Sequence, residues 1–409
     1  MRSQKNHTSV IHLASGLTVV HSRYPGAAVD YCGCVVRVGS RDDDPDAYGM
    51  AHFVEHTIFK GTQRRSAWHI INRMERVGGE LNAYTTKEET VVYTIAPAGN
   101  TARALDLIAD LLISSRFPQA ELDKEREVVA DEINSYLDTP AEAVYDDFED
   151  MLYAGTPLGH NILGEEKALA RIDSARCIQY LRDWYAMDNM VVFYCGSASA
   201  ERIASDIDRR FAALPRHCRG HATTPIACAP QFGRSRDIGS HQSHTVMGCA
   251  TPGLFDSGRY ALLLLTNILG GPGMNSLLNV ELREKRGLVY SVDASATLLS
   301  DTGAFTVYFG CDPSDTSRCM ELVRRQMERL SEVCLTSTQL AAAKKQYLGQ
   351  LAVASDSRES MIISAARAAM YFGRVAPPTE VAEQIQAVTA EQIRSAALSL
   401  CNLSYLSLV

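Results

Sequence analysis

The chain has 409 residues, of which 46% are hydrophobic and 22% are charged, and its formal net charge is −8. This is the composition of an ordinary globular protein of more than one domain, and it excludes a disordered, collagen-like or coiled-coil chain. An acidic chain without a dense Lys/Arg run also argues against a nucleic-acid partner.

Cysteine usage and hydropathy indicate the compartment. The eleven cysteines follow no paired spacing, so we expect reduced thiols in a reducing compartment. The N-terminus lacks the long apolar core of a signal peptide. The most apolar stretch, 261–269, is far below membrane-spanning length. We therefore expect a cytoplasmic protein with no membrane partner.

Apolar periodicity predicts mixed strands and helices in the first half. Strands are expected at 10–12, 17–20, 31–38, within 81–96 and at 190–195. Helices are expected at 47–59, 67–77, 102–114, 118–137, 141–152, 168–185 and from 200 onward. Pro140 is expected to end the long charged helix at 118–137. The acidic run at 42–46 predicts a solvated loop or, alternatively, a rim that attracts basic peptides.

The segment 214–236 carries three prolines and no periodic apolar face, which is typical of a linker. After it the order of elements starts again, with a strand at 244–250, a helix at 259–269, a glycine-rich turn, paired strands within 289–310, helices, and a closing strand at 403–409. This repetition predicts an internal duplication of an α+β unit. We expect an N-terminal half at 1–213, the linker at 214–236 and a C-terminal half at 237–409.

The sharpest chemical signal is the sequence His-Phe-Val-Glu-His at 52–56. On a helix, His52 and His56 share a face, so their imidazoles can bind one cation. Neutral imidazoles suit zinc, which lowers the pKa of bound water toward neutrality. Glu55 lies near the same edge and can take a proton from that water. This is the inverted zincin pattern, H-x-x-E-H, but chance produces it in roughly two of every hundred chains this long.

A catalytic zinc ion needs a third protein ligand and an open fourth position. The expected helix at 118–137 offers Glu121, Asp123, Glu125, Glu127, Asp131 and Glu132. Glu125 and Glu132 are seven residues apart, two turns along one face, so one could bind the metal while the other supports a ligand. Spacing alone does not decide which of these two carboxylates binds the metal.

Here the sequence resembles a known family of zinc peptidases, that of pitrilysin, insulysin and the mitochondrial processing peptidase, in its bacterial processing-peptidase-like branch. The similar stretches are the motif at 52–56, the Phe-Lys-Gly-Thr that follows at 59–62, and the helix sequence at 124–133. The family's third ligand is a Glu about 76 residues beyond the second His, which is the position of Glu132. The resemblance implies one zinc ion per chain held by His52, His56 and Glu132, with Glu55 as catalytic base and Glu125 as an auxiliary carboxylate.

The stretch 78–85 is similar to the family segment that ends in an exposed edge strand. An edge strand has unpaired N–H and C=O groups, to which an extended peptide can add. The resemblance thus implies a peptide-binding strand formed by Asn82, Ala83, Tyr84 and Thr85. Without the family, the same residues form an ordinary corner between a helix and a strand.

In the second half, residues 282–290 resemble the family's Arg/Tyr element, and the glycine-rich turn at 270–273 precedes them as in relatives. Arg283 and Tyr290 have the family's spacing of seven. The resemblance implies that both reach the zinc site and stabilise the oxyanion that develops on attack. Without it, Arg283 would be taken for a surface charge.

Together these observations predict a zinc-dependent endopeptidase. The expected fold class is α+β, with two homologous halves, each a mainly antiparallel sheet with helices packed on one face, arranged as a clamshell or an enclosing dimer. The family implies that unfolded peptides or presequence-like segments are cut inside an enclosed cavity. Because one chain carries both the metal motif and the Arg/Tyr element, a self-sufficient homodimer or monomer is possible, and of the two we expect a homodimer.

Two alternatives stay open. The family also includes non-catalytic core subunits of a respiratory complex and inactive partners of processing peptidases, which lose part of the zinc motif, whereas this chain keeps it. A peptidase dedicated to maturing one ribosomally made peptide is the other alternative to a general peptide scavenger.

Overall fold

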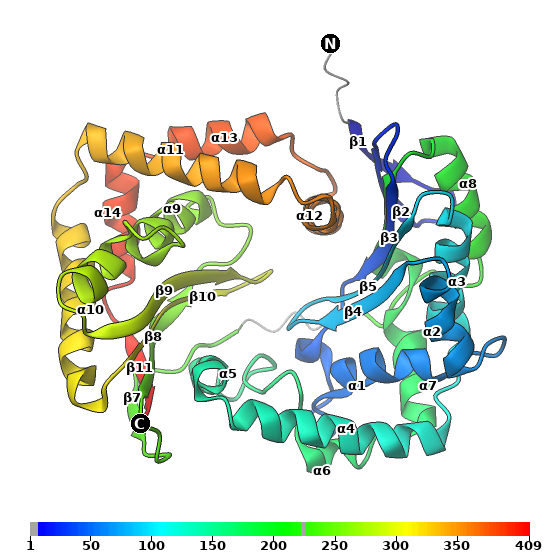
Figure 1. Cartoon of the computed structure of the whole chain (residues 1–409), viewed down its shortest axis with the longest axis horizontal. Coiled ribbons are helices and arrows are strands. Elements are labelled where there is room, and N and C mark those ends of the chain that lie inside the picture. The colour runs from blue at the N-terminus through cyan, green and yellow to red at the C-terminus, as the bar shows by residue number, and fades with distance from the viewer. Residues whose placement is uncertain (1–6, 222–225) are drawn as a thin grey trace. The chain divides into compact units, whose positions relative to one another are not determined.

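The computed structural model describes residues 7–221 and 226–409, which form two compact units (Figure 1). Unit 1 contains the described residues of 1–133, 161–223 and 354–376. Unit 2 contains those of 134–160, 224–353 and 377–409. Each unit is built on its own β-sheet.

A six-stranded sheet forms the centre of unit 1. Its strands are β1 (His7–His12), β2 (Thr18–Arg23), β3 (Val29–Val36), β4 (Glu80–Thr85), β5 (Thr90–Pro97) and β6 (Met190–Gly196). They lie in the order β1-β2-β6-β3-β5-β4, and every neighbouring pair except β2 and β6 is antiparallel. All of β6 is buried, as its continuous apolar sequence predicts. β4 lies at one edge and pairs only with β5.

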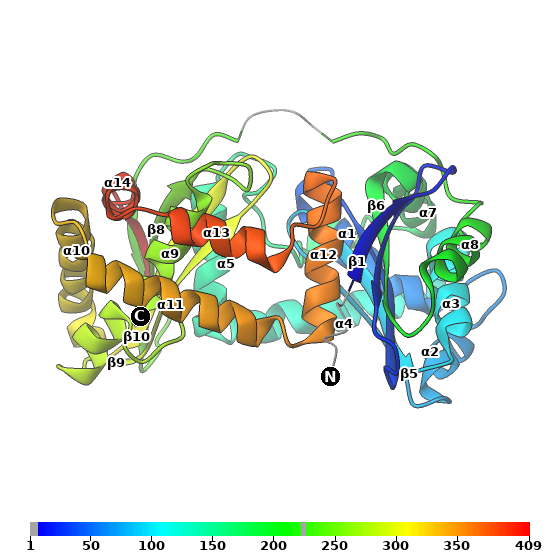
Figure 2. The ribbon, with the colours of Figure 1, turned by 90° about the horizontal axis from the view of Figure 1, so that it is seen from above.

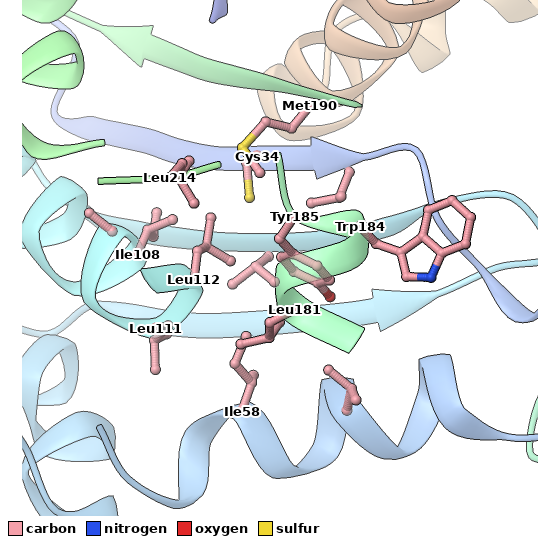
Figure 3. Close-up of a cluster of buried hydrophobic side chains, with 14 of the residues drawn as sticks. Cys34, Ile58, Ile108, Leu111, Leu112, Leu181, Trp184, Tyr185, Met190 and Leu214 are labelled. Atoms are coloured by element: carbon pink, nitrogen blue, oxygen red, sulfur yellow. The ribbon is translucent and has the colours of Figure 1, made fainter. Parts of the chain in front are cut away.

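Helices cover both faces of this sheet. The helices on one face, or beginning there, are α1 (Met50–Thr57), α2 (Ala67–Glu75), α3 (Thr101–Ser114), α4 (Gln119–Leu137), α6 (Glu166–Leu169), α7 (Ser174–Trp184) and α8 (Ala200–Arg210). Figure 3 shows part of the core beneath them, where Leu112 and Leu181 contribute from α3 and α7. Ile58 belongs to the same core, so the end of α1 is anchored in it.

The opposite face of the same sheet is covered by α12 (Arg358–Phe372), as Figures 1 and 2 show. Ile362 and Ala366 of this helix pack in a cluster with Phe193 of β6. Gly33 of β3 permits this packing, because a Cβ atom there would come within 2.4 Å of the Phe193 ring. The prediction that helices pack on one face of each sheet is therefore incomplete for unit 1, because α12 covers the second face.

Unit 2 contains a five-stranded sheet. Its strands are β7 (Gly233–Arg236), β8 (Ser243–Thr251), β9 (Val289–Leu298), β10 (Gly303–Cys311) and β11 (Ser404–Leu408). The order is β7-β11-β8-β10-β9, and only β7 and β11 run parallel. β7 lies inside the expected linker at 214–236, and no apolar alternation marks it because all four of its residues are exposed.

The helices of unit 2 also lie on two faces. One core contains residues of α9 (Arg259–Gly270), α10 (Thr316–Glu332) and α14 (Ala390–Ser399), and α11 (Ser337–Ala354) and α13 (Pro378–Ala387) complete this part of the chain. A second cluster joins Phe148 of α5 (Pro140–Leu152) to Val246 of β8 and Leu406 of β11. Pro140 lies in the first turn of α5, so it begins a new helix as well as following the end of α4.

Each unit contains one helix that comes from the other half of the sequence. α5 comes from the first half of the sequence but belongs to unit 2, and α12 comes from the second half but belongs to unit 1. The expected regions 1–213, 214–236 and 237–409 describe order along the chain and stay predictions, and the compact units cut across them. No helix among the described residues is long and apolar enough to cross a membrane.

Candidate metal centre

The helix that carries the HxxEH sequence is capped by a buried acidic side chain. Asp43 accepts hydrogen bonds from the backbone amides of Gly49 (2.9 Å) and Ala51 (3.0 Å) at the start of α1. Burial raises the pKa of Asp43, and these hydrogen bonds oppose the rise. Gly49 has a φ of 95°, which glycine adopts without strain.

The acidic run at 42–46 is therefore not a uniformly solvated loop, whereas its alternative role as a rim for basic peptides stays a prediction. Asp43 faces inward as the cap of α1, whereas Asp42 pairs with His221 at 2.9 Å and Asp46 with Arg176 at 2.6 Å. Asp44 and Asp46 are the exposed aspartates of the run, with 61% and 52% of their side chains accessible.

The second helix of the site, α4, carries Glu125 and Glu132 on a single stripe. Leu122, Glu125 and Val129 are its buried residues, at intervals of three and four. Glu132 is the next position on this stripe and is exposed. The helical periodicity thus directs Glu125 and Glu132 to the same side as the core contacts of α4.

Three side chains converge on one point. One ligand atom from each of His52, His56 and Glu132 lies within 4.8 Å of the other two. Oε2 of Glu132 is 3.8 Å from Nε2 of His52 and 3.4 Å from Nε2 of His56. Within residues 7–221 and 226–409, no other group of three His, Cys, Asp or Glu side chains has this spacing. Two imidazoles and one carboxylate are a donor set that zinc accepts in catalytic sites.

Electrostatics favour the metal-binding form of His52. Burial, with a smaller contribution from the neighbouring His56, lowers the pKa of His52 to about 3. The imidazole is therefore neutral at physiological pH and can use a lone pair to bind a cation.

A carboxylate behind His56 fixes the orientation of that ring. Nδ1 of His56 is 3.0 Å from Oε1 of Glu125, and Nζ of Lys60 is 2.6 Å from Oε2 of the same carboxylate. Burial would raise the pKa of Glu125, but the hydrogen bonds from His56 and Lys60 hold it below the ordinary value. Burial likewise opposes protonation of His56, yet the hydrogen bond to Glu125 outweighs it and the pKa of His56 is raised.

Glu55 lies beside the three converging side chains and is not one of them. Its Oε2 accepts a hydrogen bond from the Thr85 hydroxyl at 3.4 Å. Burial raises the pKa of Glu55 to about 7, with a further contribution from Glu132, while His56 and Thr85 oppose the rise. A carboxylate with a pKa near neutrality is suited to both accepting and returning a proton.

A pocket of about 510 Å³ adjoins these residues. Its walls include Glu55, His56 and Lys60 on one side and Glu80, Leu81 and Asn82 of β4 on the other. The pocket therefore links Glu55 and His56 to the edge strand within unit 1.

The predicted peptide-binding residues Asn82, Ala83, Tyr84 and Thr85 all belong to β4, and β4 is an edge strand. The amide of Thr86 donates to the carbonyl of Glu89 at the turn that joins β4 to β5. In an antiparallel pair, every second residue hydrogen-bonds to the neighbouring strand through its main chain. Starting from Thr86, Asn82 and Tyr84 therefore direct their main-chain groups toward β5, and Ala83 and Thr85 direct theirs away from it. Only every second residue of the predicted set thus offers main-chain groups at the edge.

Arg283 and Tyr290 belong to unit 2. Arg283 lies in the π-helix Asn279–Glu284, and Tyr290 lies in β9 with 61% of its surface exposed. Both side chains are exposed in their own unit. Their approach to the zinc ligands stays a prediction.

Sequence reasoning missed two contributions to this site. Lys60 is identified from the sequence only as part of a family signature, although it lies four residues after His56 and so on the same face. The capping role of Asp43 is not predictable, because Asp43 lies among other aspartates and no local pattern distinguishes the one that faces inward.

Comparison with known proteins places the chain in a family. Residues 18–166 match the insulinase family (peptidase family M16), and residues 171–347 match the peptidase M16 inactive domain. The chain belongs to peptidase family M16, as its resemblance to pitrilysin and insulysin predicted.

Among its relatives is the uncharacterized zinc protease YmxG of Bacillus subtilis, which is 30% identical over 394 residues, covering 96% of this chain and 95% of the relative. The uncharacterized zinc protease Rv2782c of Mycobacterium tuberculosis is 32% identical over 403 residues, covering 96% of this chain and 90% of the relative.

Two solved structures share the fold. The peptidase M16 inactive domain from Pseudomonas fluorescens has a TM-score of 0.89 and 20% identity, covering 98% of this chain and 97% of that one. A protease from Helicobacter pylori has a TM-score of 0.89 and 21% identity, covering 98% and 99%. The predicted α+β fold with two related halves is confirmed.

Proposed function

We propose that this chain is a zinc-dependent endopeptidase, in which His52, His56 and Glu132 hold one zinc ion. The observation that carries the proposal is the convergence of these three side chains, from two separate helices, within 4.8 Å of one another. The relatives named zinc proteases support it.

The residues around the cluster have complementary roles in this proposal. A bound zinc ion supplies Lewis acidity and lowers the pKa of a water molecule. Glu55 takes the proton of the attacking water and returns it to the leaving amine, for which its raised pKa is suited. Glu125 holds His56 so that Nε2 remains available for binding. Arg283 and Tyr290 are proposed, from the family resemblance, to stabilise the oxyanion.

The proposed substrate is an unfolded peptide. Ala83 and Thr85 on the edge of β4 offer main-chain groups that only an extended chain can pair with. The Thr85 hydroxyl contacts Glu55, so a peptide paired with this strand passes beside the catalytic base. Cleavage of presequence-like segments inside an enclosed cavity, and assembly as a homodimer, belong to the same proposal and rest on the family resemblance.

The variant Glu55→Gln tests the proposal against a non-catalytic role. An enzyme should lose hydrolysis of an unstructured fluorogenic peptide by at least about 100-fold, because general-base catalysis contributes about that much. The zinc content should stay unchanged, because Glu55 is not among the converging ligands. Glu127→Gln is the matched control, since Glu127 is an exposed residue of α4.

Equal peptidase activity in the wild type and in Glu55→Gln would contradict the assignment of the base. A zinc-loaded wild type that hydrolyses none of a varied set of unstructured peptides would favour the non-catalytic subunit instead.

A further inference from the structure

The side chain of Arg367 on α12 contacts both arms of the β4–β5 hairpin. Its Nε donates to Oε2 of Glu89, just before β5, and its Nη2 donates to the hydroxyl of Tyr84 on β4 at 3.2 Å. The chain reaches α12 only in the second half of its sequence, yet α12 is part of unit 1. No local sequence pattern connects residue 367 with the edge strand.

The contact with Glu89 is an ion pair in which the carboxylate is buried and 37% of the Arg367 side chain stays accessible. Glu89 is 7% exposed, and it also accepts a hydrogen bond from Tyr371, one turn further along α12. Burial raises the pKa of Glu89, and Arg367 opposes the rise. Burial also disfavours the charge of Arg367, but Glu89 outweighs this and the pKa of Arg367 is raised. The ion pair therefore ties the guanidinium to the residue just before β5, although the guanidinium itself stays partly accessible to water.

The contact with Tyr84 affects the orientation of the neighbouring residues of β4. Successive residues of a strand point their side chains to opposite faces. Ala83 packs against the core on the α1 side, whereas Tyr84 packs on the α12 side. Fixing the Tyr84 side chain toward α12 therefore fixes the rotation of the strand about its own axis. That rotation sets the direction of the free main-chain groups of Ala83 and Thr85, and the position of the Thr85 hydroxyl on Glu55.

We infer that Arg367 is a positioning residue that holds the edge strand β4 in the orientation required to pair with a peptide. It acts through Tyr84 and Glu89 and touches neither the converging histidines nor Glu55 in the contacts described above. The part of this inference that concerns peptide binding rests on the proposed function, and the part that concerns strand order does not.

The same helix offers a matched control. Arg358 begins α12, and its guanidinium lies 4.7 Å from the centre of the Tyr24 ring, beyond the end of β2. Arg358→Ala removes the same group from the same helix without touching β4. Tyr84→Phe removes only the hydroxyl that Arg367 binds, and Arg367→Lys keeps the charge but loses the fork of donors.

Amide hydrogen exchange of the full chain tests the inference without relying on activity. Asn82 and Tyr84 direct their amides toward β5, so their exchange reports on the order of the strand. Arg367→Ala should speed exchange in residues 80–86 by about tenfold, the equivalent of losing one charged hydrogen bond. Arg358→Ala should leave this segment unchanged, and Tyr84→Phe should give a smaller increase. Equal exchange in Arg367→Ala and Arg358→Ala would overturn the inference.

Peptide binding and kinetics test its functional part. In the Glu55→Gln background, Arg367→Ala should weaken binding of a labelled unstructured peptide about fivefold to tenfold. In the active enzyme, Arg367→Ala should raise KM about fivefold to tenfold with little change in kcat. Arg367→Lys should bring KM part of the way back to the wild-type value. A fall in kcat at constant KM would overturn the positioning role. A wild type that neither binds nor cleaves peptides contradicts the proposed function, while the exchange result still decides the order of β4.

Discussion

Nδ1 of His56 donates a hydrogen bond to Oε1 of Glu125 across 3.0 Å. An ionised carboxylate can only accept, so Nδ1 carries a proton, and in the neutral ring the lone pair of Nε2 is then free. Nε2 is the atom that lies 3.4 Å from Glu132. Glu125 thus selects the tautomer of His56 that can bind a metal beside Glu132.

The first prediction follows from this pair. Glu125→Gln should weaken zinc binding about 10-fold to 100-fold, because ligand-orienting carboxylates contribute that much to affinity. Competition with a chromogenic chelator measures the change. Glu127→Gln, on the exposed face of the same helix, should bind zinc as the wild type does. Identical zinc affinity in both variants would show that Glu125 does not orient His56.

The second prediction concerns the cap of the motif helix. Asp43→Ala removes the acceptor of the Gly49 and Ala51 amides and should cost about 1–2 kcal/mol of stability. Thermal unfolding should shift down by about 2–8 °C, the range expected for domains of this size. Asp44→Ala is the control, because this neighbour is largely exposed and should change the Tm little. Equal shifts in both variants would contradict the capping role.

The third prediction concerns the partly buried carboxylate of Asp293 in unit 2. The hydroxyl of Tyr145 lies 3.1 Å from both carboxylate oxygens of Asp293, and burial raises the pKa of Asp293 despite this hydrogen bond. The folded state therefore keeps a proton at pH values where the unfolded carboxyl, with a pKa of about 4, has lost it. This contribution to stability is present at low pH and is lost as the pH rises through the folded pKa.

Asp293→Asn removes that dependence while leaving an acceptor for Tyr145. The Tm of the variant relative to the wild type should rise as the pH increases from about 4, the unfolded pKa, toward neutrality. Asp237→Asn, at an exposed position of the same unit, should not show the trend. A constant Tm difference between Asp293→Asn and the wild type over this range would count against a raised pKa of Asp293.

Much of the site could be predicted because its chemistry is local in the sequence. The spacing of His52 and His56 places both on one face of a helix, and the separation of Glu125 and Glu132 by seven positions places both carboxylates on one stripe of another. The choice of Glu132 as ligand came from family resemblance, since periodicity alone allowed either glutamate. The convergence of the two helices is a tertiary property that no local pattern contains.

What the sequence did not predict depends on contacts between distant segments. The exchange of α5 and α12 between the two units follows from which sheet face each helix can cover, and periodicity does not specify the sheet. The contact of Arg367 with Tyr84 joins residues 283 positions apart. The strand β7 has no apolar alternation, because it is an exposed edge that pairs with β11 through its main chain.

The central claim is that His52, His56 and Glu132 bind one zinc ion, and metal analysis of the purified full chain tests it most directly. After dialysis against zinc and removal of free metal, the wild type and Glu127→Gln should each retain about one zinc ion per chain, as expected for a three-ligand catalytic site. Glu132→Ala and the double variant His52→Ala/His56→Ala should retain almost none while unfolding cooperatively. A metal-free wild type, or a wild-type zinc content in the double histidine variant, would contradict the account.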